Sequence, residues 1–164
     1  MEKTKLKVLI LDDEQARHDT FVHAFDALPC DVQYDLELIH ALNAEEALKT
    51  FQAGKVDIFF SDHDLGYYSD DGNQLATKIL MEVPEAHWPT YVVVHSANWS
   101  GARNIGSKFR GAGIQTLEQS FHSDSFVDDS DRWQPIAYNW IRNCANLGKP
   151  WEGNLHGWKQ EDNG

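Results

Sequence analysis

Short apolar segments alternate along the chain with segments whose apolar residues recur at helical spacing. Residues 6–11 form a nearly uninterrupted apolar run bounded by charge, which is typical of a strand covered on both faces of a parallel sheet. Residues 14–28 then place their apolar side chains at helical intervals, and Pro29 disfavours a longer helix. This part of the chain is therefore predicted to be a strand followed by a helix.

The same alternation continues as far as residue 117. Further strands are predicted over residues 36–41, 56–61, 91–95 and 114–117, and helices over residues 44–52, 72–81 and 101–109. Strands and helices that alternate at these lengths form right-handed crossover units, which build a parallel sheet with helices on both faces. The predicted fold class is therefore α/β, a doubly wound five-stranded parallel sheet in three layers.

A further helix and an irregular tail are predicted after the fifth strand. Residues 124–131 are acidic and polar, which is typical of a loop, and apolar residues return at helical intervals from Trp133 to Cys144. A chain of 164 residues with 41% apolar content can bury one substantial core. We therefore expect one α/β domain over residues 1–147, with an irregular tail over residues 148–164 that packs on the domain or trails from it.

The charge balance restricts the classes of partner. With 26 acidic and 14 basic residues the formal net charge is -12, which repels the backbone of duplex nucleic acid. The protein could still bind a small phosphate compound if a divalent cation or a local group of Arg and Lys makes the electrostatic potential positive at the site. No stretch approaches the roughly 20 apolar residues of a membrane span, so we expect a soluble, cytoplasmic protein with no membrane partner. Cys30 and Cys144 predict no disulfide framework. The charge balance does not exclude a homodimer.

Polar side chains follow three of the predicted strands, at the edge where parallel strands end and ligands gather. They are Asp12 and Asp13 after the first strand, Asp62, His63 and Asp64 after the third, and His95, Ser96 and Asn98 after the fourth. Carboxylates within a few ångströms of one another repel unless they are protonated or bridged by a cation. A site for Mg²⁺ or Mn²⁺, which prefer oxygen ligands, is therefore predicted at Asp12, Asp13 and Asp62.

Donors suited to phosphate oxygens come after the fourth strand. Ser96, Asn98 and the backbone N–H groups of Gly101 and Ala102 lie before or at a predicted helix start, where N–H groups favour anions. Arg103 begins a short cationic segment without acidic residues, and it is the candidate phosphate clamp.

Two histidines at the same edge are candidates for proton transfer, because imidazole titrates near neutral pH. Of His63 and His95, one would activate a water and the other would protonate the leaving oxygen, with Asp64 orienting one imidazole. For His95, which ends an apolar run, a buried structural histidine is the alternative. A calcium loop that starts at Asp62 is excluded, because its twelfth position is Asn73 instead of the required Glu.

The order of elements and motifs resembles a response-regulator receiver domain over about residues 5–147. LILDDE is similar to the acidic pair after the first receiver strand, DIFFSD places Asp62 at the phosphoacceptor position, and Ser96 stands at the switch hydroxyl. The resemblance implies the flavodoxin-like strand order 2-1-3-4-5. Gln119, however, stands where receivers carry a lysine, which argues against ordinary aspartyl-phosphate signalling.

Three ordered motifs are more similar to the cyclic-phosphate processing receiver-like domains. They are LDDE, SDHDLG with a following DG, and VVHSAN with a following Gly101 and Asn104. This resemblance implies activity on a cyclic phosphate. It also adds Asn104 to the substrate-binding candidates, which are then Ser96, Asn98, Gly101, Arg103 and Asn104.

The leading hypothesis is a metal-dependent phosphoesterase that hydrolyses a cyclic phosphate. Its partner would be a small phosphate-containing substrate or an RNA end, namely a cyclic nucleotide or the 2′,3′-cyclic phosphate of a nucleoside or RNA end. One alternative is a receiver-like module that binds or sequesters a cyclic nucleotide or a signalling protein without chemistry. A third hypothesis is a receiver that signals through protein contacts after phosphorylation of Asp62.

Overall fold

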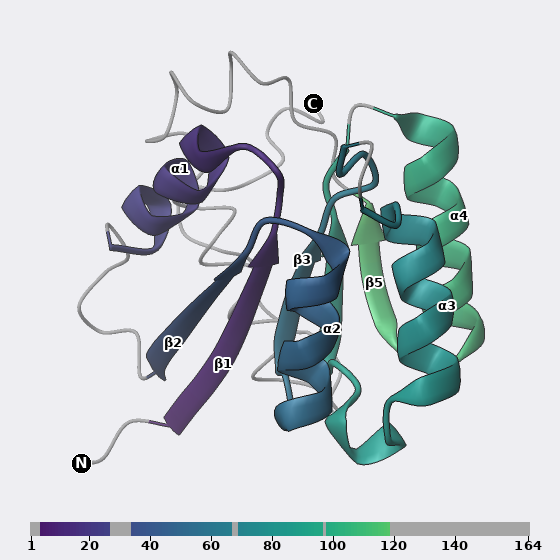
Figure 1. Ribbon diagram of the computed structural model, residues 1–164. Helices are drawn as coiled ribbons and strands as arrows, with labels where there is room; N and C mark the ends of the chain where they lie inside the picture. The colour runs from purple at the N-terminus through teal and green to yellow at the C-terminus, as the bar shows by residue number, and fades with distance from the viewer. Residues whose placement is uncertain (1–3, 27–33, 67–68, 97, 119–164) are drawn as a thin grey trace, which may run out of the picture.

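Five parallel strands form a single sheet in the order β2-β1-β3-β4-β5 (Figure 1). The computed structural model describes residues 4–26, 34–66, 69–96 and 98–118. The strands are β1 (Thr4–Leu11), β2 (Tyr34–Ala41), β3 (Ile58–Ser61), β4 (Tyr91–Val94) and β5 (Gln115–Glu118). The predicted fold class and strand order are confirmed.

Helices lie on both faces of this sheet, which gives the three predicted layers (Figure 1). They are α1 (Gln15–Asp26), α2 (Ala44–Ala53), α3 (Gly72–Glu82) and α4 (Trp99–Gly111), with a short 3-10 helix η1 (Glu85–His87) before β4. α2, α3 and α4 stand side by side on one face, and α1 lies on the other.

The central strands are buried on both faces, which explains their continuous apolar sequences. All four residues of β3 and all four of β4 are buried. Phe59 faces the three-helix side, where its ring lies 5.0 Å from that of Phe51 and 6.2 Å from that of Phe109. Phe60 faces the other side and lies 4.9 Å from Phe21 and 5.8 Å from Phe25 of α1.

Side-chain caps fix the starts of three helices at the edge of the sheet where the strands end. Asn43 accepts a hydrogen bond from the Glu46 N–H before α2, and Asp71 forms a capping box with Gln74 before α3. Asn98 accepts one from the Gly101 N–H, so α4 begins at Trp99, two residues before the predicted start.

Part of the sequence-based prediction falls outside the described residues. This part comprises the end of the first predicted helix, the acidic loop, the closing helix from Trp133, the tail over residues 148–164, and Gln119. Among the described residues, none of the helices combines the length and the apolar composition that a membrane crossing needs.

Candidate functional site

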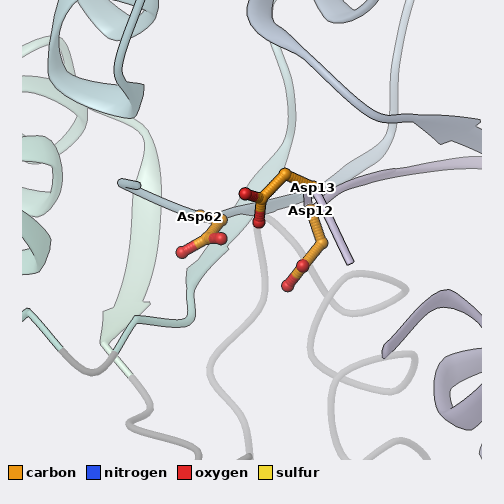
Figure 2. A group of neighbouring side chains, drawn as sticks. All are labelled: Asp12, Asp13 and Asp62. Atoms are coloured by element: carbon orange, nitrogen blue, oxygen red, sulfur yellow. The ribbon is translucent and has the colours of Figure 1, made fainter. Parts of the chain in front are cut away.

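Three carboxylates from two neighbouring strands meet at the carboxyl edge of the sheet (Figure 2). β1 pairs with β3 so that Ile10 lies opposite Phe60, and the aspartates Asp12 and Asp62 each follow two residues later. One oxygen from each of Asp12, Asp13 and Asp62 lies within 4.8 Å of the others. Asp12 and Asp62 are buried and Asp13 is exposed. The predicted gathering of these three aspartates is confirmed.

The environment of Asp62 disfavours its ionised form. Burial is the main cause and the neighbouring Asp12 carboxylate the next, and together they raise the pKa of Asp62 to about 8. Partial burial and Asp12 also raise the pKa of Asp13. The cluster thus holds its negative charge at a cost, which a cation between the carboxylates would offset.

Arg17 of α1 already supplies part of that positive charge. Its Nη1 lies 3.1 Å from Oδ2 of Asp12 and 4.0 Å from Oδ2 of Asp62, and its Nε lies 3.8 Å from Glu14. The side chain of Arg17 is only 11% exposed. Sequence reasoning missed this residue, although an arginine in the first turn of the helix that follows an acidic pair was a usable signal.

His18 contacts the backbone of Asp12, and His40 contacts His18. Nε2 of His18 lies 2.8 Å from the carbonyl oxygen of Asp12, which assigns the proton to that nitrogen. Nδ1 of His18 lies 2.7 Å from Nδ1 of His40 at the end of β2. The Asp12 N–H donates to the Ala41 carbonyl at 3.2 Å. These contacts, which the sequence did not indicate, tie β1, β2 and α1 together at the cluster.

His95 lies inside the molecule behind the carboxylates. It is 1% exposed, its Nδ1 lies 3.6 Å from Oδ2 of Asp12, and its ring lies 5.3 Å from that of Phe21. Burial, followed by the charges of Arg17 and His18, lowers the pKa of His95 to about 3. The imidazole is therefore neutral at physiological pH, which favours the structural alternative over a role as a proton donor.

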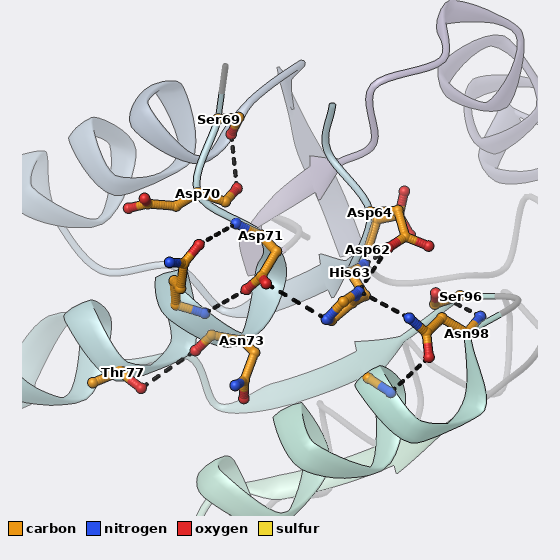
Figure 3. A network of polar contacts seen from close by, with 12 residues as sticks. Asp62, His63, Asp64, Ser69, Asp70, Asp71, Asn73, Thr77, Ser96 and Asn98 are labelled. Atoms are coloured by element: carbon orange, nitrogen blue, oxygen red, sulfur yellow. Dashed lines mark hydrogen bonds and ion pairs between the residues drawn. The ribbon is translucent and has the colours of Figure 1, made fainter. Parts of the chain in front are cut away.

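His63 is held at the surface of the same edge by three polar side chains (Figure 3). Its Nδ1 lies 2.8 Å from the carboxylate of Asp64 and 3.3 Å from the amide nitrogen of Asn98, and its Nε2 lies 3.8 Å from Asp71. The imidazole also packs on Gly101, where a Cβ would lie only 2.4 Å from the ring. His63 and Asp64 thus lie together as predicted, in an orientation fixed from several sides.

The loop that carries Asp62 and His63 returns closely to the start of α3. The Gly72 N–H donates to the His63 carbonyl at 2.8 Å. A Cβ at position 72 would lie 2.1 Å from the carbonyl oxygen of Asp62, so only glycine fits this close approach. This contact explains why a glycine follows the Asp71 cap.

The predicted phosphate-binding residues are only partly brought together. Ser96 is buried and its Oγ accepts the Asn98 N–H at 3.0 Å. The N–H groups of Gly101 and Ala102 are engaged by the side chain and carbonyl of Asn98 at 2.9 Å each. The N–H donors expected at this helix start are therefore already satisfied, because the helix begins earlier than predicted.

Arg103 and Asn104 occupy exposed positions on α4. Among the described residues, neither forms an ion pair or hydrogen bond with the carboxylate cluster. Their roles as phosphate clamp and substrate ligand stay predictions.

The three aspartates fit a hard divalent cation. They present only oxygen ligands, two of them buried and one open to solvent, which suits Mg²⁺ or Mn²⁺. The raised pKa of Asp62 is a second reason to expect a cation here, because that carboxyl lacks sufficient positive charge around it. The cluster could therefore hold such a cation.

Solved structures with the same fold are response-regulator receivers. The regulator domain of CheB from Thermotoga maritima superposes with a TM-score of 0.56 at 16% identity, covering 84% of this chain and 96% of that one. The Mn²⁺-bound form of response regulator Rcp1 gives 0.56 at 14%, covering 80% and 93%. A receiver domain of an HD domain-containing protein from Pseudomonas fluorescens Pf-5 gives 0.52 at 15%, covering 86% and 98%. At these identities the likeness concerns the fold.

The sequence comparison is more specific than these superpositions. No curated protein shows significant sequence similarity to the chain. Residues 7–111, however, match the family described as the cyclic-phosphate processing receiver domain. This match runs from β1 to the end of α4 and includes the aspartate cluster, His63 and Asn98. The chain therefore belongs to the cyclic-phosphate processing receiver domain family.

Proposed function

We propose that this protein is a metal-dependent phosphoesterase that hydrolyses a cyclic phosphate. The observation that carries the proposal is the position of His63. Its backbone N–H donates to Asp62 of the Asp12–Asp13–Asp62 cluster at 2.8 Å, and its imidazole lies against three polar side chains. A family named for cyclic-phosphate processing supports this substrate class. A cation site beside a positioned imidazole supports hydrolysis over simple retention of the ligand.

Asp12, Asp13 and Asp62 would hold Mg²⁺ or Mn²⁺ in this proposal. When bound, such an ion lowers the pKa of a coordinated water and polarises a phosphoryl oxygen. The response regulator Rcp1, whose structure shares the fold, was solved in an Mn²⁺-bound form, which supports a divalent cation in a protein of this fold. Arg17 stabilises the negative charge of Asp12 when no metal is present, and a metal ion would compete with its guanidinium for the two buried carboxylates.

His63 is the proposed proton carrier. Water attacks phosphorus, one P–O bond of the ring breaks, and the products are a phosphomonoester and a free hydroxyl. His63 removes the proton of the attacking water and returns a proton to the leaving oxygen, so that protons balance over the cycle. Asp64 and Asp71 stabilise the imidazolium formed in between, since they lie 2.8 and 3.8 Å from its two nitrogens.

The remaining predicted residues support this step in different ways. His95 stays neutral and packs behind Asp12, so we assign it a positioning role in place of the proton transfer considered from the sequence. Asn98 contacts His63, and its N–H donates to Ser96, whose O–H would be a donor for a phosphoryl oxygen. Gly101 provides the surface on which His63 rests.

The test is incubation of the purified protein with nucleoside 2′,3′-cyclic and 3′,5′-cyclic phosphates. ³¹P NMR would follow phosphomonoester formation with Mg²⁺, with Mn²⁺ and with a chelator. We expect turnover that needs the metal and is lost in Asp62→Asn, whereas Asp35→Asn, an exposed aspartate of β2, retains it. Ligand that is bound and recovered unchanged would instead indicate the non-catalytic binding module.

A further inference from the structure

A cavity of about 660 Å³ lies between the turn after β2 and the loop after β3. Its volume falls within the roughly 300–1,000 Å³ that small-molecule sites occupy. The apolar part of its lining consists of Ala44 and four leucines, namely Leu42, Leu48, Leu65 and Leu75. Leu42 is 42% exposed, which is unusual for a leucine that serves only the core.

Two of the residues that line the cavity are close in the chain to residues of the aspartate cluster or to their hydrogen-bond partners. Leu42 directly follows Ala41, whose carbonyl accepts the Asp12 N–H at 3.2 Å. Leu65 comes three residues after Asp62, on the same loop. The sheet order changes direction between β1 and β3, and ligands of open α/β sheets bind at the carboxyl edge beside such a switch point. A ligand with its phosphate at the aspartates would therefore extend toward these leucines.

The charges of the lining disfavour a polyanionic ligand. Asp70 is paired with Lys78 at 2.5 Å, while Glu45 makes no ion pair with any other described residue. The lining thus keeps one unbalanced negative charge, in a chain whose formal net charge is -12. Further phosphates would be repelled here. A neutral group with hydrogen-bond donors would fit, since Glu45 and Asp70 offer acceptors.

We propose that this cavity binds the nucleoside part of the substrate, so that the enzyme acts on a single nucleoside cyclic phosphate and not on an RNA end. The proposal rests on the proposed function. The base lies among the leucine side chains, and the base amino group or a ribose hydroxyl donates to Glu45. The phosphate of the same molecule lies at Asp12, Asp13 and Asp62.

The first experiment compares substrates with and without a base. The probes are adenosine 2′,3′-cyclic phosphate, adenosine 3′,5′-cyclic phosphate and glycerol 1,2-cyclic phosphate, which has no base. We expect kcat/KM at least tenfold higher for one adenosine substrate than for the glycerol compound. Leu48→Phe, which narrows the cavity, should remove this preference by raising KM. Leu80→Phe is the matched control, because Leu80 also packs on the core but does not line the cavity.

A second comparison tests the charge argument. An oligonucleotide ending in a 2′,3′-cyclic phosphate should be turned over at least tenfold less efficiently than the mononucleotide. Glu45→Lys should reduce that difference, since Glu45 is exposed and its replacement adds a cation to the lining. Equal use of glycerol, adenosine and oligonucleotide substrates by the wild-type protein would overturn the proposal while leaving the phosphoesterase function intact.

If no cyclic phosphate is hydrolysed, a binding experiment with adenosine tests the nucleoside site separately from the phosphoesterase function. In amide NMR spectra of the full chain, adenosine should shift the signals of Leu65, Gly66 and Ser69 in the wild-type protein and in Asp62→Asn, but not in Leu48→Phe. Such shifts without turnover would reject the phosphoesterase and retain the nucleoside site. Unchanged spectra at millimolar adenosine, together with no preference for a base, would reject the site.

Discussion

The guanidinium of Arg17 lies between two buried carboxylates, 3.1 Å from Asp12 and 4.0 Å from Asp62. It occupies the electrostatic role that a divalent cation would take, because it brings positive charge to a cluster in which the pKa of Asp62 is raised to about 8. One guanidinium does not fully compensate two or three carboxylates. Negative charge is therefore left over at the cluster, to which a divalent cation could bind.

Replacement of Arg17 should change the stability of the metal-free protein and its affinity for Mg²⁺ in opposite directions. In Arg17→Gln the carboxylate of Asp12 loses its partner inside the protein, so the free energy of unfolding without metal should fall by about 3 kcal/mol. Mg²⁺ should bind more tightly to the variant, because a competing cation is gone. Urea unfolding and isothermal titration with Mg²⁺ measure the two quantities.

A matched control is available in Arg110→Gln. Arg110 pairs with Glu118 at 2.5 Å, but its side chain is 49% exposed, so the loss should be no more than about 1 kcal/mol. Weaker Mg²⁺ binding by Arg17→Gln would contradict the assigned competition and would make Arg17 a supporting group of the metal site.

Much of the fold was predictable because burial shapes the sequence directly. β3 and β4 are covered on both faces, and their sequences therefore contain the uninterrupted apolar runs IFF and YVVV, which predict buried strands. The convergence of Asp12 and Asp62 followed from parallel strands ending at one edge, without knowledge of any contact. The cap residue Asp71 and the glycine after it were also visible as a motif.

The site residues that were missed depend on how helices rotate and where they begin. Arg17 and His18 reach Asp12 only because α1 packs with that side toward the strand end. Helix spacing alone does not reveal this orientation. The start of α4 was placed too late, since Asn98 could be interpreted as a ligand or as a cap, and it serves as the cap. The C-terminal predictions lie beyond the described residues.

The stability of the metal-free protein should decrease above pH 6.5. The pKa of Asp62 is about 8 in the folded state against 3.8 otherwise, so the folded state retains a proton that the unfolded state loses, and stability falls as pH rises from about 4 to 8. The pKa of His95 is about 3 in the folded state against 6.5 in the unfolded state. Its contribution to the stability of the fold therefore rises as the pH rises from 3 to 6.5. The two effects oppose each other below pH 6.5, and only that of Asp62 remains above it.

Urea unfolding between pH 5 and 8.5, with and without Mg²⁺, measures this dependence. The decline above pH 6.5 should be at most about 1.4 kcal/mol per pH unit, and saturating Mg²⁺ should reduce it by stabilising the ionised carboxylate. Asp62→Asn should show no such decline. A metal-free protein that becomes more stable from pH 6.5 to 8 would show that Asp62 is ionised already.

Replacement of His63 should impair the chemical step more than binding. If His63 transfers the protons, His63→Gln should lower kcat by about 10²–10⁴-fold with a much smaller change in KM. The fold should remain, because the glutamine amide is polar like the imidazole and can hydrogen-bond to Asp64 in its place. His23→Gln, at an exposed position of α1, is the control and should behave as the wild type. A kcat within threefold of the wild type would assign the proton transfer to another group.

Alanine at three glycines should distinguish a backbone constraint from a side-chain contact. At Gly72 the new Cβ would meet the Asp62 carbonyl at 2.1 Å, so the loop must move and the free energy of unfolding should fall by about 2 kcal/mol or more. At Gly101 the obstacle is the His63 ring at 2.4 Å, which can rotate away. Gly101→Ala should therefore fold and bind Mg²⁺ but lose turnover, because His63 leaves Asn98 and Asp64.

Gly111→Ala serves as the reference for these two variants. No atom lies within 4 Å of a Cβ at Gly111, the last residue of α4, so alanine there should stabilise by about 0.5 kcal/mol through its higher helix propensity. Thermal unfolding, Mg²⁺ titration and turnover of a cyclic phosphate give the three readouts. If Gly101→Ala kept full turnover, the orientation of His63 by Asn98 and Asp64 would be irrelevant to the reaction, and the proton carrier would have to be sought elsewhere.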